Sequence, residues 1–207
     1  MLWVFDMDNT LYGPTQEIER IVTARMKAVL CARAVIPEDA YEKRRGELKR
    51  IHATDDTILA FAMEYGLPYE DLIRETYLFQ PLSCYEMGLR PGAKTIQDLP
   101  GKKSVLTNSP ILYAQAILTC FGITSWFETI YANQPATPIK KPLPAAYRHI
   151  VSQEPVVMIE DSEANLLVPK QLGWTTIWFP VRQQEPPFPP HVDHVIDDLS
   201  LLRGLLR

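Results

Sequence analysis

The sequence has few cysteines, and the pattern of the three that it does have points away from metal binding. Cys31, Cys84 and Cys120 are far apart and lack the spacing of metal ligands. Their number is odd, which is unlike the paired cysteines of a disulfide-stabilised scaffold. We therefore interpret them as reduced and mostly buried thiols of a cytosolic protein.

Long hydrophobic segments and an excess of positive charge are also missing. No apolar run approaches the ~20 residues that a membrane-spanning helix needs, and no basic and apolar leader precedes the pattern that starts at Leu2. A formal net charge of −4 argues against a surface that coats nucleic acid, which would need a basic patch, but it permits a small anionic substrate. We expect a soluble cytoplasmic protein that binds no nucleic acid polymer and no membrane. The sequence indicates no oligomeric state.

What the sequence does contain is a regular alternation of short apolar runs and amphipathic stretches. Runs this short, apolar on both faces and rich in β-branched and aromatic residues, predict strands buried between helices in a parallel sheet. The predicted strands are 2–5, 105–106, 129–131, 156–159, 175–179 and 194–196. The 207 residues, of which 46% are hydrophobic, are typical of one domain with a modest insertion. We predict a doubly wound α/β domain.

One long segment interrupts this alternation. Residues 13–90 show helical patterns and no good strand, with turn signals at both ends. Within it, Thr54 is predicted to cap one helix, and 70–79 is predicted to form another. We predict an all-helical domain at 13–90, inserted into a core formed by 1–12 and 91–207. In that core, Ser109 is predicted to cap a helix that has Pro110 at its first position, and the five prolines between 180 and 190 predict a surface loop.

Side chains suited to chemistry stand at the carboxyl ends of the predicted strands, where ligands of open α/β sheets bind. Asp6 and Asp8 directly follow the first strand, and two carboxylates desolvated together favour a hard divalent cation. Three later segments supply a hydroxyl and an amide, a lysine before a predicted helix, and a second acidic pair. They are Thr107-Asn108-Ser109, Lys140-Lys141-Pro142 and Glu160-Asp161-Ser162.

Each of these signals also has a purely structural interpretation when it is taken alone. Asp8 and Asp161 could be helix caps, and Thr107 could belong to a turn. His191 and His194 are spaced like a metal pair, yet we interpret them as a loop residue and the start of a strand. The joint arrival of acid, hydroxyl, lysine and acid at one sheet edge is what favours an active site.

The four segments also resemble a known set of motifs. Phe-Asp-Met-Asp-Asn-Thr-Leu-Tyr, Leu-Thr-Asn-Ser, Lys-Lys-Pro and Ile-Glu-Asp-Ser-Glu-Ala-Asn occur in the order of the four motifs of the haloacid dehalogenase-like (HAD) superfamily. The similarity covers most of 1–12 and 91–200. It implies a Rossmannoid α/β core with an inserted helical cap, and a phosphatase that forms an aspartyl-phosphate.

The resemblance implies a role for each matching residue. Asp6 would be the nucleophile, and Asp8 would protonate the leaving oxygen and later activate water. Thr107 and the main chain of Asn108 would bind phosphoryl oxygens. Lys141, which directly precedes the proline of its motif, would offset the negative charge of Asp6 and of the phosphate.

The resemblance also implies Mg²⁺ as cofactor. Its ligands would be Asp6, the main-chain carbonyl of Asp8, and Asp161, with Glu160 as a further ligand or acting through water. The sequence departs from the family pattern at Glu160, where many members have a second aspartate. It also has Pro169 in the segment after Asp161, which predicts a short or kinked helix there.

The inserted segment suggests a substrate class. Asp-Asn-Thr-Leu-Tyr, together with His52-Ala-Thr54 and Glu64-Tyr65-Gly66-Leu67, resembles the pyrimidine 5′-nucleotidase branch of the superfamily. This implies a nucleoside 5′-monophosphate as the phosphomonoester substrate, with Lys49 and His52 as candidate contacts. The alternatives are a sugar-phosphate or phosphoglycolate phosphatase, or a phosphomutase.

Other activities on the same scaffold remain to be weighed. A dehalogenase needs neither a general acid nor a metal, so Asp8 and Asp161 disfavour it. A phosphonatase needs a lysine in the cap, for which Lys27, Lys43 and Lys49 stay open. A non-catalytic binding or regulatory module would be expected to lose the nucleophile or a metal ligand, and all four motifs are present here.

Overall fold

The computed structural model describes residues 1–79, 86–134 and 140–205, so Cys84 lies outside the described part. The chain divides into two compact units. One comprises Met1–Thr15, Glu86–Asn133 and Ile139–Arg207, and the other comprises Gln16–Tyr85 and Gln134–Pro138. Cys31 is a buried free thiol as predicted, whereas Cys120 is exposed, which corrects the expectation of burial.

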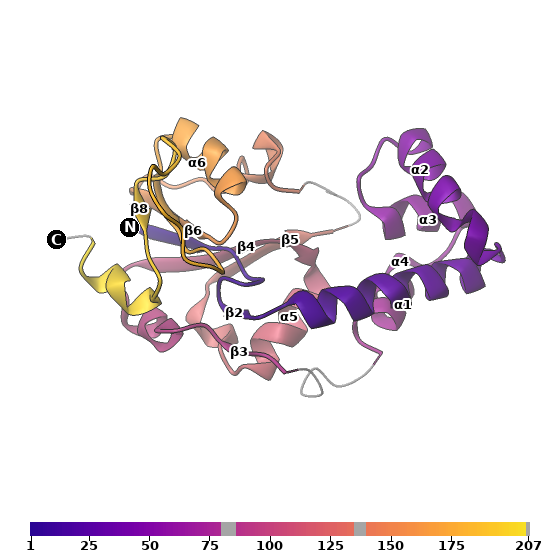
Figure 1. Ribbon diagram of the computed structural model, residues 1–207, viewed down its shortest axis with the longest axis horizontal. Helices are drawn as coiled ribbons and strands as arrows, with labels where there is room; N and C mark the ends of the chain where they lie inside the picture. Colours follow the sequence, from indigo (N-terminus) through magenta and orange to yellow (C-terminus); the bar gives the residue numbers. More distant parts are fainter. Residues whose placement is uncertain (80–85, 135–139, 206–207) are drawn as a thin grey trace. The chain divides into compact units, whose positions relative to one another are not determined.

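A six-stranded parallel sheet forms the centre of the first unit (Figure 1). Its order is β5-β4-β1-β6-β7-β8, so the first strand of the chain lies between strands that come about a hundred residues or more later. The strands are β1 (Leu2–Phe5), β4 (Lys102–Pro110), β5 (Thr129–Asn133), β6 (Val156–Glu160), β7 (Thr175–Trp178) and β8 (His194–Val195). All six predicted strands are present, and the predicted doubly wound α/β class is confirmed.

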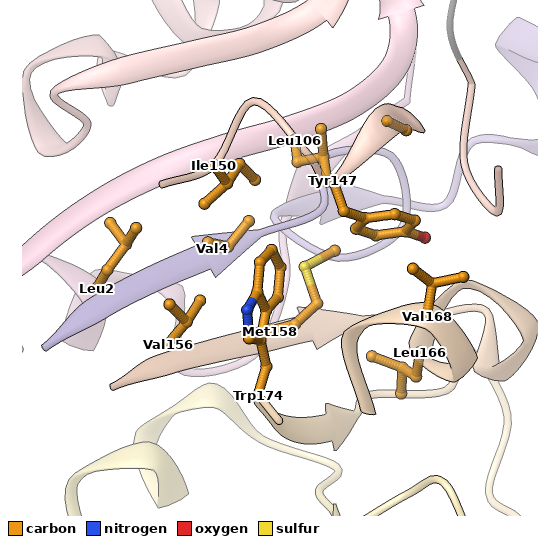
Figure 2. Close-up of a cluster of buried hydrophobic side chains, with 11 residues drawn as sticks. Leu2, Val4, Leu106, Tyr147, Ile150, Val156, Met158, Leu166, Val168 and Trp174 are labelled. Atoms are coloured by element: carbon orange, nitrogen blue, oxygen red, sulfur yellow. The ribbon is translucent and has the colours of Figure 1, made fainter. Parts of the chain in front are cut away.

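One face of the sheet packs against the segments around η5 (Pro144–Ala146) and α6 (Leu167–Gln171), which precede and follow β6 in the chain. Because side chains alternate along a strand, Leu2 and Val4 point to this face, where they meet the other members of one apolar cluster (Figure 2). Those members are Leu106, Ala146, Tyr147, Ile150, Val156, Met158, Leu166, Val168 and Trp174. α6 has only five residues and follows the 3-10 turn η6 (Glu163–Leu166), so the predicted short helix around Pro169 is confirmed.

The opposite face carries α5 (Ile111–Cys120), which packs against β4 and β5 (Figure 1). Trp3 and Phe5 point to this side, where their rings stack on one another and Phe5 meets Phe127 edge-on. The buried indole of Trp3 donates to the carbonyl of Pro100 at 2.8 Å. Three 3-10 segments complete the unit, η3 (Ala93–Asp98), η4 (Thr124–Trp126) and η7 (Leu199–Arg203).

The second unit is helical between 16 and 77. It contains α1 (Gln16–Ala34), η1 (Glu38–Ala40), α2 (Tyr41–Ile51), α3 (Thr57–Tyr65) and α4 (Tyr69–Tyr77). The predicted cap of α3 is wrong, because the N-cap is Asp56, whose carboxylate accepts from the main-chain N–H of Leu59 at 3.0 Å. The hydroxyl of Thr54 instead accepts from the N–H of Asp56, the N-cap residue itself, at 3.1 Å.

One further detail differs from the sequence-based expectations. The segment 13–90 is not free of strands, because β2 (Tyr12–Gly13) pairs antiparallel with β3 (Gly88–Leu89). Each strand has only two residues, which is too short for an apolar pattern to reveal. Residues 180–190 contain no helix or strand, as predicted. Among the described residues, no helix combines the length and apolar character that crossing a membrane requires.

Candidate active site

The two carboxylates of the first motif are fixed by the loop that follows β1. The N–H of Asp6 donates to the carbonyl of Ile159 at 2.9 Å, which continues the sheet pairing for one residue beyond the strand. The chain then turns, with the N–H of Leu11 donating to the carbonyl of Met7 at 2.9 Å. Asn9 has a φ of 62°, a left-handed conformation that asparagine tolerates better than most residues. Asp6 and Asp8 are thereby placed at the carboxyl edge of the sheet.

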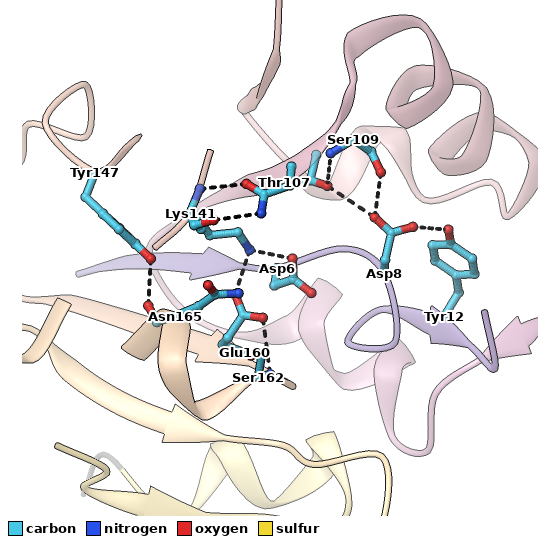
Figure 3. A network of polar contacts seen from close by, with 11 residues as sticks. Asp6, Asp8, Tyr12, Thr107, Ser109, Lys141, Tyr147, Glu160, Ser162 and Asn165 are labelled. Carbon is cyan, nitrogen blue, oxygen red and sulfur yellow. Dashed lines mark hydrogen bonds and ion pairs between the residues drawn. The ribbon is translucent and has the colours of Figure 1, made fainter. Parts of the chain in front are cut away.

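Lys141 joins the first and last motifs through a buried ion-pair triad (Figure 3). Its Nζ lies 2.5 Å from Oδ1 of Asp6 and 2.6 Å from Oε2 of Glu160. Burial alone would lower the pKa of Lys141, but the charges of Asp6 and Glu160 outweigh it and the pKa is raised. The lysine is therefore a fixed positive charge between two carboxyl groups, and its role in offsetting the charge of Asp6 during catalysis stays a prediction.

A third carboxyl group completes an acidic cluster. Oxygens of Asp6, Glu160 and Asp161 lie within 4.8 Å of one another. Burial raises the pKa of Glu160 to about 8 and that of Asp161 to about 6, and the charge of Asp6 adds to both shifts. Trp178 helps to fix the loop by donating from Nε1 to the carbonyl of Asp161 at 2.8 Å. Carboxylate oxygens are hard ligands, and here three carboxyl groups lie close together with Lys141 as the cation in contact with two of them. Such a cluster fits a divalent cation such as Mg²⁺.

Asp8 faces away from this cluster toward a set of hydroxyl groups (Figure 3). Its Oδ2 accepts from the hydroxyl of Ser109 at 2.8 Å and from that of Thr107 at 3.3 Å, and its Oδ1 accepts from the phenol of Tyr12. Burial raises the pKa of the Asp8 carboxyl, and the charge of Asp6 adds to the rise, whereas the three hydroxyls oppose it. No side-chain oxygen of Asp8 belongs to the acidic cluster, so its predicted metal contact through the main-chain carbonyl stays a prediction.

The structure also shows what the remaining residues of the second motif do. Thr107 is buried in the last half of β4, and its Oγ1 accepts from the N–H of Ser109 at 3.0 Å. The side chain of Asn108 holds the loop of Lys141, accepting from its N–H at 2.7 Å and donating to its carbonyl at 3.0 Å. This side-chain role was not anticipated from the sequence. The predicted phosphate contacts of Thr107 and of the Asn108 main chain stay predictions.

The two predicted substrate contacts of the inserted segment lie in the helical unit. Lys49 lies 3.4 Å from a carboxylate oxygen of Asp55, and Nε2 of His52 lies 3.1 Å from one of Glu64. Both candidates thus already have an acidic partner within their own unit. Substrate binding by Lys49 and His52 stays a prediction.

Sequence reasoning misassigned one residue of this site and missed the contacts of two others. Ser109 was expected to cap α5, but the N-cap is Pro110, and the Ser109 hydroxyl donates to Asp8 instead. Tyr12 contacts Asp8, and Tyr113 contacts Tyr12 in turn. Tyr12 ends the Asp-Asn-Thr-Leu-Tyr segment of the first motif, but the motif does not indicate that its hydroxyl meets Asp8. Tyr113 has no sequence signal, because its contact depends on how α5 packs. His191 and His194 lie in a loop and at the start of β8, as expected.

Comparison with known proteins places this geometry in a family. A family model described as haloacid dehalogenase-like hydrolase matches residues 1–173. A phosphoglycolate phosphatase from Colwellia psychrerythraea is 24% identical over 180 residues, which cover 81% of this chain and 78% of that protein.

Solved structures share the fold over nearly the whole chain. A HAD phosphatase from Thermococcus onnurineus aligns with a TM-score of 0.63 and 20% identity, covering 99% of this chain and 97% of that one. CbbY from Rhodobacter sphaeroides, solved in complex with phosphate, aligns with a TM-score of 0.62 and 20% identity, covering 97% and 95%. At these identities the structures show the common fold, while the family model extends over most of the chain and all four motifs. The chain belongs to the haloacid dehalogenase-like hydrolase family.

Proposed function

We propose that this hydrolase is a phosphatase that cleaves a small phosphomonoester through an aspartyl-phosphate on Asp6. The observation that carries the proposal is the buried triad in which Lys141 contacts both Asp6 and Glu160, with Asp8 held separately by hydroxyl groups. One carboxylate is thus kept beside a fixed cation, as a nucleophile requires, and another sits where its pKa is raised, as a general acid requires.

The chemistry follows from these two environments. An oxygen of Asp6 attacks phosphorus, the bond from phosphorus to the leaving oxygen breaks, and Asp8 gives its proton to that oxygen. A water molecule then attacks the phosphorus of the aspartyl-phosphate, Asp8 takes a proton from this water, and inorganic phosphate leaves while Asp6 is regenerated. Lys141 offsets negative charge throughout, and Thr107 and the Asn108 main chain bind phosphoryl oxygens.

The acidic cluster is the proposed Mg²⁺ site. Asp6, Glu160 and Asp161 would hold the ion, together with the main-chain carbonyl of Asp8. When bound, it would supply the positive charge that lets several carboxylates and a phosphate share one pocket. Lys141 cannot do this alone, because it contacts Asp6 and Glu160 and leaves Asp161 without a direct cationic contact at its carboxylate among the described residues.

The substrate class favoured by the comparisons is a phosphoglycolate or sugar phosphate. The curated relative that covers 81% of the chain is a phosphoglycolate phosphatase, and none of the relatives named above is described as a nucleotidase. The pyrimidine 5′-nucleotidase assignment rests on sequence resemblance in the inserted segment. Its two candidate contacts, Lys49 and His52, are already paired with Asp55 and Glu64. We therefore place the phosphoglycolate and sugar-phosphate class first and the nucleotide class second.

We further propose that the helical insertion is the cap that determines selectivity. The core site supplies groups for phosphate and metal only, so discrimination between leaving groups has to come from elsewhere. The helical unit lies in the chain between the first motif and β4, and it carries both polar groups and aromatic side chains. Several of these aromatics are committed to its core, since Tyr41, Phe61 and Tyr65 pack ring against ring.

The deciding experiment is a kcat/KM comparison across phosphomonoesters with Mg²⁺ present. The panel contains 2-phosphoglycolate, glucose 6-phosphate, and the 5′-monophosphates of uridine, cytidine and inosine. We expect phosphoglycolate or the sugar phosphate to lead. A lead by the pyrimidine nucleotides would restore the nucleotidase assignment, and Lys49→Ala and His52→Ala would then test the cap contacts. Absence of phosphate release from every ester, in a folded protein with Mg²⁺, would overturn the phosphatase proposal itself.

A further inference from the structure

The phenol of Tyr12 is a buried polar group in contact with Asp8 that the chemistry above does not use. Tyr12 is fully buried at the start of β2, and its hydroxyl donates to Oδ1 of Asp8. We propose that Tyr12, backed by Tyr113, is a positioning residue that holds the carboxyl of Asp8 in the orientation needed to protonate the leaving group. The inference rests on the proposed phosphatase function, in which Asp8 is the general acid and base.

The loop after β1 brings Tyr12 back to Asp8. The two residues form an isolated β-bridge although only four positions separate them. The left-handed Asn9 makes this return possible, and its side chain closes the loop by accepting from the N–H of Thr15 at 3.0 Å. The N–H of Arg90 donates to the carbonyl of Leu11 at 3.0 Å and ties the same loop to β3. Tyr12 is therefore placed by the backbone as well as by its side chain.

The position of the phenol is also fixed from the other side. Its oxygen lies 3.0 Å from that of Tyr113, a buried residue of α5. The ring of Tyr12 packs against Phe121 with 5.4 Å between the ring centroids. The hydroxyl that meets Asp8 thus belongs to a ring anchored in the core, and it cannot follow Asp8 if the carboxyl rotates.

The carboxyl of Asp8 is consequently held at both oxygens. Tyr12 binds Oδ1, whereas Ser109 and Thr107 bind Oδ2 at 2.8 and 3.3 Å. A carboxyl group offers about four acceptor sites, and three are taken by these hydroxyls. Among the residues that the structure describes, no side-chain hydroxyl takes the remaining site, which leaves it for the proton that passes to the leaving oxygen. Without Tyr12, Oδ1 would lose its donor and the carboxyl could turn about its Cβ–Cγ bond, which would misplace that proton.

A comparison of leaving groups separates this role from a merely structural one. An alkyl phosphomonoester has a poor leaving group that needs the proton of Asp8, whereas p-nitrophenyl phosphate has a good one that leaves without it. For Tyr12→Phe, we expect kcat/KM to fall about 10-fold or more with 2-phosphoglycolate or glycerol phosphate, below the ~10²–10⁴-fold loss typical of removing a general acid. The value for p-nitrophenyl phosphate should change by less than about 3-fold.

Three further variants define the scale. Asp8→Asn should lower kcat/KM more than Tyr12→Phe does, and its loss should again be greater with the alkyl ester than with p-nitrophenyl phosphate. Adding Tyr12→Phe to Asp8→Asn should lower kcat/KM little further. Tyr69→Phe is the matched control, because its phenol donates to Oδ2 of Asp56 at 3.2 Å in the helical unit, and its substrate ratio should equal that of the wild type. Tyr113→Phe, one hydroxyl further from Asp8, should give a smaller loss than Tyr12→Phe in the same selective direction.

The outcomes distinguish the inference from the function on which it rests. Equal losses with both esters, or no loss with either, in a Tyr12→Phe protein that unfolds cooperatively would overturn the positioning role. If Tyr12→Phe fails to fold, Tyr113→Phe decides, and an unchanged substrate ratio in that variant rejects the proposal. A wild-type protein that hydrolyses neither ester would instead reject the phosphatase function. An Asp8→Asn protein without leaving-group selectivity would reject the assignment of Asp8.

Discussion

The side-chain amide of Asn108 forms two hydrogen bonds with the main chain of Lys141. It accepts from the N–H at 2.7 Å and donates to the carbonyl at 3.0 Å. The two residues are 33 positions apart, so this pair connects the end of β4 to the loop that carries the buried lysine. The ammonium group of Lys141 then reaches Asp6 and Glu160 from a backbone that is held in place.

This relationship predicts that Asn108→Leu loosens the lysine loop. Two main-chain groups lose their partner, so we expect the free energy of unfolding to fall by about 1–3 kcal/mol. We also expect kcat to fall, because Lys141 would no longer be held against Asp6. Asn108→Asp is the matched control, since its carboxylate can accept from the N–H but cannot donate to the carbonyl. Its stability and its kcat should lie between those of the wild type and those of Asn108→Leu. Urea denaturation and steady-state kinetics measure both effects, and unchanged values for Asn108→Leu would contradict the prediction.

Asp6→Asn tests the covalent step. Asparagine is nearly isosteric with aspartate, so the fold should remain, but the amide cannot accept a phosphoryl group as the carboxylate does. We expect hydrolysis to fall to a trace, and we expect beryllium fluoride, which mimics an aspartyl-phosphate, to inhibit the wild type and to be found on Asp6. An Asp6→Asn variant that retains substantial hydrolysis would rule out the aspartyl-phosphate. Circular dichroism before and after substitution shows whether the fold is intact.

Much of the fold could be predicted because its signals are local and strong. The strands around Val4 and Met158 are apolar on both faces, which only a sheet covered by helices accommodates. The helix caps were harder, because several residues near a helix start can each act as the cap. Asp56, not Thr54, caps α3, although the two residues lie in the same loop. Ser109 does not cap α5, because its hydroxyl donates to Asp8, a residue 101 positions away in the sequence.

The motif residues of the site could likewise be predicted, but their contacts could not. Acid, hydroxyl, amide and lysine at strand ends indicate which side chains gather at one edge. They do not indicate that Asn108 binds the backbone of Lys141, since that depends on where the loop before Pro142 runs. Tyr113 carries no sequence signal, because a tyrosine on an apolar helix face is compatible with many different hydroxyl partners. Its position in the sequence therefore does not indicate that it contacts Tyr12.

Removal of divalent metal should abolish turnover. Without a cation, the carboxylates of Asp6 and Asp161 repel an incoming phosphate, and Lys141 offsets only part of their charge. We expect no phosphate release after thorough chelation, and recovery when Mg²⁺ is added back. Asp161→Asn should require a higher Mg²⁺ concentration for half-maximal activity than the wild type. Activity that survives chelation undiminished would contradict both the metal site and its proposed ligands.

The raised pKa values predict how stability depends on pH when no metal is present. The pKa of Glu160 is raised from 4.5 to about 8, and that of Asp161 from 3.8 to about 6. Between the ordinary and the raised values the native state binds more protons than the unfolded state, so the free energy of unfolding should fall as pH rises from about 4.5 to about 8. Chemical denaturation of the chelated protein at several pH values measures this slope, and Glu160→Gln should make it shallower.

Mg²⁺ should oppose this loss of stability at higher pH, because it binds the carboxylates only after their protons have left. A ligand that binds the native state stabilises it in proportion to the logarithm of its concentration over Kd. Since protons compete for the same oxygens, the stabilisation by a fixed Mg²⁺ concentration should be greater at pH 8 than at pH 5.5. Thermal unfolding with and without Mg²⁺ at the two pH values gives the comparison. A gain that is equal at both pH values, or greater at the lower one, would show that Glu160 and Asp161 do not bind the ion.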